Sequence, residues 1–69
     1  MKPEKRSLTI AGHQTSVSLE PAFWAALKQM ADEQGQSMPD LIRTIDATER
    51  DASLSSTLRV HILNWALAR

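Results

Sequence analysis

The sequence predicts a mainly α domain that has one short β-strand followed by three helices and that forms a homodimer. Three observations support this fold class. Thr15–Leu19 alternates polar and apolar residues, which is typical of a strand with one buried face. Three later stretches place apolar residues at helical spacing. The chain has 69 residues and no cysteine, so it lies near the lower limit for independent folding and has no disulfide to stabilise it.

A second copy of the chain is the expected source of the missing stability. A solitary strand leaves backbone groups unpaired and is marginal in water. We therefore expect two chains to pair Thr15–Leu19 as an intermolecular antiparallel two-stranded ribbon, whose small polar face is the working surface. Ser7–Ile10 also alternates. It either folds back as another strand, through a turn at Ala11–His13, or forms the extended lead-in to the main strand.

The N-terminal residues are predicted to form a flexible basic arm over 1–6, ahead of a folded domain over 7–69. The arm carries a charge of +2, and the rest of the chain brings the formal net charge to zero. Such an arm is suited to phosphate contacts, although a solubilising tail has the same composition. The sequence shows no signal peptide or membrane span, so we expect a cytoplasmic protein with no membrane partner.

Start and stop signals delimit the helices. The first helix is expected to begin at Pro21, whose fixed φ suits the first turn, and to end at Gly35. Ser37 is placed to cap the second helix by accepting a hydrogen bond from the first turn, with Asp40 completing a variant of the capping box. The third helix is expected to start near Ser53 to Ser56.

Apolar residues from the strand and all three helices are expected to form the dimer core. The third helix also has apolar residues off its main stripe, which is typical of a helix wedged between neighbours or subunits. The residues expected in the dimer core are Val17, Leu19, Phe23, Trp24, Leu27, Ile45, Leu58, Ile62 and Trp65.

The sequence offers little on which to build a catalytic or metal site. His13 and His61 are not at a metal-binding spacing, and no serine is flanked as a nucleophile elbow requires. No glycine-rich phosphate loop, clustered acid pair or thiol is present. Trp24 and Trp65 lie at core spacing, where tryptophans are usually packing anchors rather than base-stacking platforms. No enzymatic activity, metal or cofactor is therefore expected.

The order of strand, proline-started helix, Gly35–Ser37 turn and capped second helix resembles the ribbon-helix-helix DNA-binding superfamily of the Arc and MetJ type. Lys5–Glu20, Phe23–Trp24 and Leu54–Val60 further resemble a subfamily of small bacterial proteins with that fold. The resemblance covers nearly the whole chain and implies a dimer whose strands form a ribbon in the DNA major groove. The third helix is an addition to the usual core. Asp46 and Arg59 also match the subfamily, and we expect a salt bridge between them.

The resemblance also implies roles for individual residues. The base-facing positions are Gln14, Ser16 and Ser18. The phosphate-binding positions that it implies are the backbone N–H groups of Ser37 and Met38, at the start of the second helix. The charge of the arm separately suggests Lys2, Lys5 and Arg6 as phosphate-binding residues. Two of the three base-facing residues are serines, whereas family members often carry long basic or amide side chains there.

These inferences predict a DNA-binding homodimer that acts as a transcriptional regulator or as the antitoxin-like half of an operon-repressing pair. The alternative is a protein-interaction module that has kept the dimeric fold without specific DNA readout. In that case a second polypeptide, rather than double-stranded DNA, is the partner of the dimer.

Overall fold

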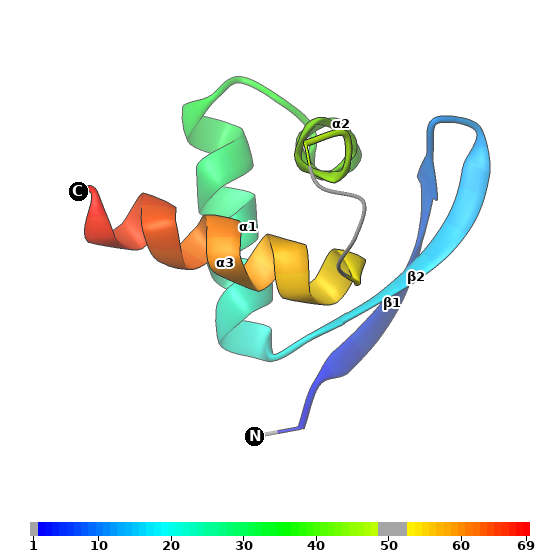
Figure 1. The fold of residues 1–69 in the computed structure, drawn as a ribbon, viewed down its shortest axis with the longest axis horizontal. Helices are drawn as coiled ribbons and strands as arrows, with labels where there is room; N and C mark the ends of the chain where they lie inside the picture. Colours follow the sequence, from blue (N-terminus) through cyan, green and yellow to red (C-terminus); the bar gives the residue numbers. More distant parts are fainter. Residues whose placement is uncertain (1, 49–52) are drawn as a thin grey trace.

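The chain folds as a β-hairpin followed by three helices (Figure 1). The computed structural model describes residues 2–48 and 53–69. Strands β1 (Glu4–Ile10) and β2 (His13–Leu19) form a two-stranded antiparallel sheet. Helix α1 runs over Pro21–Glu33, α2 over Met38–Asp46 and α3 over Leu54–Leu67. In Figure 1 the hairpin lies to one side of the helices, and the C-terminus lies on the opposite side of the molecule.

The hairpin corrects the expectation of one strand per chain. β2 has its antiparallel partner in the same chain, because β1 folds back onto it with Ser7 opposite Ser16. The turn has two residues, Ala11 at φ 52° and Gly12 at φ 82°. Two successive positive φ angles are those of a type I′ turn, which matches the twist of the strands that it joins. Of the two possibilities for Ser7–Ile10, the structure therefore contains the returning strand.

The start of the chain also departs from the expected flexible arm over 1–6. Glu4, Lys5 and Arg6 belong to β1. The indole Nε1 of Trp24 donates a hydrogen bond of 2.8 Å to the backbone oxygen of Glu4, and the guanidinium of Arg6 lies 4.5 Å from the centre of the Trp24 ring. The alternation of polar and apolar residues did not predict that these residues belong to a strand, because they are held by contacts with Trp24 of α1, which is distant in the sequence.

The predicted start and stop signals agree with the structure. Pro21 opens α1, and Gly35 adopts φ 66° just after it. The N–H of Gln36 reaches back 2.9 Å to the oxygen of Ala31, which closes the helix end as a Schellman motif does. Ser37 caps α2 by accepting from the N–H of Asp40 at 3.2 Å, and Ser53 caps α3 in the same way through the N–H of Ser56.

The core lies between the inner face of the hairpin and the three helices. Seven of the nine residues expected in the dimer core are buried within one chain, and Phe23 and Trp65 are partly buried. Val17, Leu19, Leu27 and Leu58 are fully shielded from solvent. One chain thus covers these side chains by itself, so a contact with a second copy has to use other groups. No helix among residues 2–48 and 53–69 is long and apolar enough to span a membrane.

Candidate nucleic-acid interface

The outer face of the hairpin is entirely polar. Residues paired across an antiparallel ladder share a face, and faces alternate along each strand. The register pairs Lys5 with Ser18, Ser7 with Ser16 and Thr9 with Gln14, so these six side chains occupy the face opposite the core. All are solvent-exposed except Ser18, which is half-buried. Lys5 supplies the one charge among them.

This face contains all three residues that sequence reasoning assigned to base contacts. Gln14, Ser16 and Ser18 follow one another along it from the turn to the end of β2. The structure adds Ser7 and Thr9, which sequence reasoning missed as members of the surface. The signal was present in the alternation of Ser7–Ile10, but the sequence left open whether that stretch pairs with β2.

The far end of β2 is held by α3. The backbone N–H of Ser18 donates to Ser55 Oγ at 3.2 Å, and its carbonyl oxygen accepts from the guanidinium of Arg59 at 3.3 Å. Figure 1 shows the N-terminal end of α3 beside the hairpin. We call Ser55 and Arg59 together the α3 edge cap, because they satisfy the outward-facing backbone groups of the strand at this position.

Arg59 forms its salt bridge with Glu20, not with Asp46 as the sequence led us to expect. The Arg59 guanidinium lies 3.0 Å from Glu20 Oε1 and 5.9 Å from the centre of the Phe23 ring. A hydrogen bond from its own backbone N–H, followed by that from Arg59, lowers the pKa of Glu20 below its ordinary value. The bridge ties the start of α1 to the middle of α3 and keeps the edge cap in place.

The predicted phosphate-binding residues fall into two groups. Lys5 lies on the outer face of the hairpin, and Lys2 precedes β1 and is exposed. Arg6 points to the opposite face, where it stacks on Trp24 and contacts Glu4 at 3.2 Å. The structure therefore does not place all the basic residues of the N-terminal segment on one surface.

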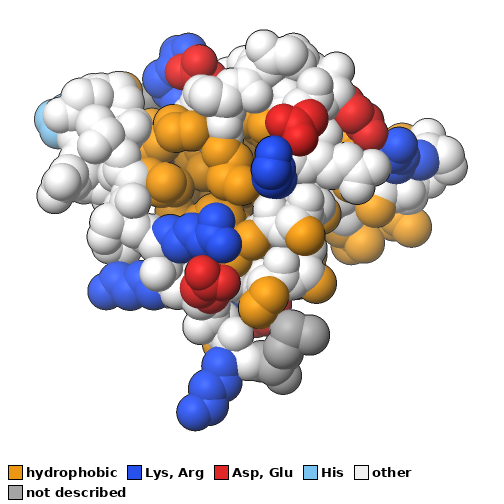
Figure 2. Space-filling view, turned by 180° about the vertical axis from the view of Figure 1, so that it is seen from behind, with side chains coloured by type: hydrophobic (Ala, Val, Ile, Leu, Met, Phe, Trp, Pro, Cys, Tyr) orange, Lys and Arg blue, Asp and Glu red, His pale blue; other side chains and the backbone are white. Residues whose placement is uncertain are grey.

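Arg6 instead lies near the start of α2. Arg6, Lys28 and Met38 line a shared hollow of about 200 Å³, beside Trp24. The N-terminal end of a helix favours an anion through its free N–H groups and its dipole. Two of the predicted phosphate-binding residues, Arg6 and Met38, are therefore brought together here. Figure 2 shows Lys and Arg side chains around the hydrophobic groups that gather between the hairpin and the helices on this side of the molecule.

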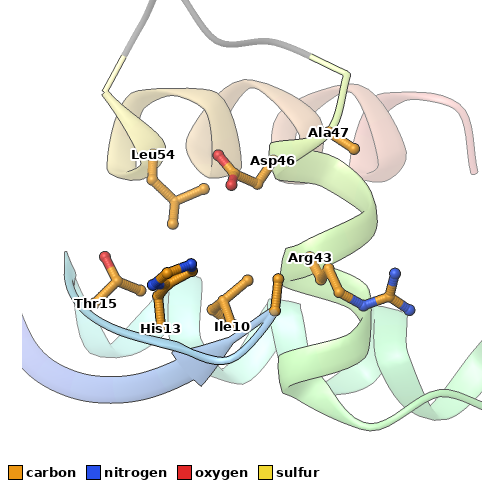
Figure 3. Close-up of a pocket in the computed structure, with 8 residues that line it drawn as sticks. Ile10, His13, Thr15, Arg43, Asp46, Ala47 and Leu54 are labelled. Carbon is orange, nitrogen blue, oxygen red and sulfur yellow. The ribbon is translucent and has the colours of Figure 1, made fainter.

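A larger cleft of about 590 Å³ lies between the hairpin tip, the end of α2 and the start of α3. Figure 3 shows Ile10, His13 and Thr15 on one side of it and Asp46 and Leu54 on the other. The Arg43 side chain extends away from this space (Figure 3). No group of three His, Cys, Asp or Glu side chains within 2–48 and 53–69 is arranged to hold a metal ion.

His61, the second histidine, does not line this cleft. Its Nε2 lies 3.5 Å from Thr48 Oγ1, at the C-terminal side of α2. The two histidines thus lie at different parts of the surface.

Comparisons with known proteins agree with this architecture. The model of the ribbon-helix-helix domain family matches residues 3–66. The solved structure of an uncharacterised protein from Bordetella pertussis Tohama I superposes with a TM-score of 0.78 at 31% sequence identity. The match covers 94% of this chain and 56% of that one, so the present chain spans little more than half the length of its structural relative. Among curated proteins, none matches this sequence.

Proposed function

The chain belongs to the ribbon-helix-helix domain family, and we propose that it acts as a cytoplasmic transcriptional regulator that binds double-stranded DNA as a homodimer. The observation that carries the proposal is the outer face of the hairpin, where every side chain is polar and the central ones are small. A β-ribbon with such a face can approach the edges of bases in the major groove without burying apolar groups against them.

Gln14 is the side chain on this face best suited to read a base. Its amide can donate and accept at once, which matches the N6 and N7 edge of adenine. Ser16 and Ser18 have short hydroxyls that accept or donate to several bases and therefore discriminate weakly. We expect a modest sequence preference centred on the Gln14 contacts, with the serines allowing close approach of the strand.

The proposed dimer places the two β2 strands side by side. Adjacent strands lie about 4.8 Å apart, so a sheet in the order β1, β2, β2, β1 measures about 14 Å between its outer strands. The major groove is about 12 Å wide, and the two central strands therefore enter it. The twist of the sheet turns each β1 along a groove wall, where Lys5 faces the phosphates and Lys2 extends the same contact.

The start of α2 provides the second proposed phosphate contact. The backbone N–H groups of Ser37 and Met38 stand at the positive end of the helix dipole. Arg6 lies in the same hollow as Met38, beside the Glu4 carboxylate that pairs with it at 3.2 Å, and a phosphate there competes with Glu4 for the guanidinium. A phosphate that reaches the open end of the hairpin is met by these groups rather than by the outer face.

Equilibrium binding to duplex DNA tests the proposal. A fluorescently labelled random duplex of about 20 base pairs is titrated at salt concentrations from about 25 to 200 mM. Affinity is expected to fall steeply as salt rises, because phosphate contacts release counterions. Absence of binding at the lowest salt, with protein whose circular dichroism shows it folded, contradicts the proposal.

One observation favours the alternative of a protein-interaction module. Val60, Leu63 and Leu67 of α3 are 56%, 54% and 74% exposed and follow one another at helical spacing along one side of the helix. A stripe of this kind suits an apolar partner surface. A dimer that ignores DNA at low salt, and loses a defined protein partner when Leu63 is changed to Lys, supports this alternative instead.

A further inference from the structure

The free edge of β2 decides how a second copy can join the sheet. In a strand, the N–H and C=O of one residue point to the same side, and those of the next residue point to the other. The two groups of Ser18 point to α3, away from β1. By the same alternation, the backbone groups of Ser16 and Gln14 also point away from β1. The tight turn agrees, since a two-residue loop makes Ile10 and His13 a hydrogen-bonded pair.

The three outward-facing positions are not equivalent. Ser18 is already bonded by the α3 edge cap, whose Arg59 is held in turn by Glu20. Among residues 2–48 and 53–69, no hydrogen bond beyond the sheet reaches the backbone groups of Gln14 or Ser16. Both residues are exposed. A strand that is added to this edge therefore finds open donors and acceptors only near the turn.

Resting on the proposed homodimer, we infer that two copies join along β2 in one register, with Thr15 on the twofold axis. A symmetric antiparallel pair must be centred on a residue. If the axis passes through Thr15, Gln14 of each chain lies opposite Ser16 of the partner subunit. These two symmetry-related pairs make about four hydrogen bonds. Centring on Ser16 sets Gln14 opposite the occupied Ser18, and centring on Gln14 sets Ser16 opposite the turn. Each of those registers leaves about two hydrogen bonds.

The shape of the hairpin tip fits the same register. With Thr15 on the axis, His13 of each copy lies opposite Val17 and ends the paired segment just before the α3 edge cap. The tip that then meets the cap consists of Ala11 and Gly12, the two smallest kinds of residue. Moving the axis to Ser16 instead places Gln14, a longer residue, opposite Ser18 and its cap. α3 therefore acts as the stop that sets the alignment of the two base-facing strands.

Disulfide trapping tests the register, since the chain has no cysteine of its own. Thr15→Cys and Ser16→Cys are compared as single variants for the rate of disulfide-linked dimer formation. Residues facing each other across the axis in a non-hydrogen-bonded pair have Cβ atoms about 4.5–5.5 Å apart, whereas diagonal neighbours lie about 7–8 Å apart. We expect Thr15→Cys to cross-link at least about tenfold faster, because only the shorter separation suits a disulfide.

The possible outcomes test the proposed register and the proposed dimer separately. Faster cross-linking of Ser16→Cys, in a protein that sediments as a dimer, overturns the Thr15 register and leaves the proposed dimer standing. A chain that sediments as a monomer at about 100 μM and cross-links at neither position overturns both. Adding Ser55→Ala and Arg59→Ala to each cysteine variant frees Ser18, and the rate advantage of Thr15→Cys is then expected to shrink. An unchanged advantage shows that α3 does not set the register.

Discussion

Arg59 in α3 forms a salt bridge of 3.0 Å with Glu20, at the junction of β2 and α1, and also donates to the backbone oxygen of Ser18. The Arg59 guanidinium therefore connects the end of β2, the strand proposed to contact bases, to both α1 and α3. The side chains of Arg59 and Glu20 are 33% and 29% exposed, so solvent screens the pair only in part.

The Glu20→Gln variant, which lacks the charge of Glu20, is expected to lose less thermal stability than the unmodified chain as the pH falls. The pKa of Glu20 is lowered by hydrogen bonds from its own backbone N–H and from Arg59, so its contribution to stability is present above its unfolded pKa and is lost as pH falls through the folded value. The difference in thermal midpoint between the unmodified chain and Glu20→Gln should therefore narrow below about pH 4.5. Glu33→Gln, at the more exposed pair with Arg69, is the matched control for losing one carboxylate.

Trp24→Phe is expected to weaken the attachment of β1. The substitution keeps an aromatic ring in the core but removes the Nε1 donor to the Glu4 oxygen. The loss of one such hydrogen bond costs about 1–2 kcal/mol in the free energy of unfolding, measured by urea denaturation followed by circular dichroism. Trp65→Phe is the control, because Trp65 is only partly buried. Equal losses in the two variants contradict a special role for the Trp24 bond.

The turn offers a substitution that should stabilise the hairpin. Ala11 adopts φ 52°, a conformation that costs a residue with a Cβ about 1–2 kcal/mol. Ala11→Asn creates the Asn-Gly pair favoured in type I′ turns and is expected to raise the free energy of unfolding by about 0.5–1 kcal/mol. Gly12→Ala should lower it by about 1 kcal/mol, although a Cβ at Gly12 meets no atom within 4 Å. A destabilising Ala11→Asn argues against this turn.

Lys5 and Arg69 form a matched pair for testing the DNA surface. Each substitution to Ala removes one positive charge, but Lys5 lies on the outer face of the hairpin and Arg69 at the C-terminal end, across the molecule (Figure 1). Lys5→Ala is expected to reduce the slope of log affinity against log salt by about 0.9 per chain, for one lost phosphate contact. Arg69→Ala should leave the slope nearly unchanged. Equal reductions of this slope in the two variants indicate that DNA binding depends only on the total charge of the protein.

Leu58 and Leu63 distinguish the core of one chain from its exposed helical stripe. Leu58 is fully buried, whereas Leu63 is 54% exposed. Leu58→Ala is expected to cost about 2–5 kcal/mol in the free energy of unfolding, and Leu63→Ala less than about 0.5 kcal/mol. A large, concentration-dependent loss for Leu63→Ala, measured by thermal unfolding at several protein concentrations, instead reveals that a partner covers α3.

Much of the fold follows from local signals in the sequence. Pro21, Gly35 and Ser37 mark helix ends through φ preferences and caps that involve residues only a few positions away. Alternation in Thr15–Leu19 determines which side chains share a face, since successive residues in a strand point to opposite sides. The polar surface that includes Gln14 and Ser16 was therefore predictable before any tertiary contact was known.

The tertiary structure alone decided which groups pair across the chain. Whether β2 joins β1 or a second copy, and whether Arg59 meets Glu20 or Asp46, depends on how distant segments approach one another. Such contacts are set by the packing of the whole core, and spacing within one element carries no record of them. The sequence determined the elements and their faces, and the three-dimensional arrangement determined which edge of β2 stays open.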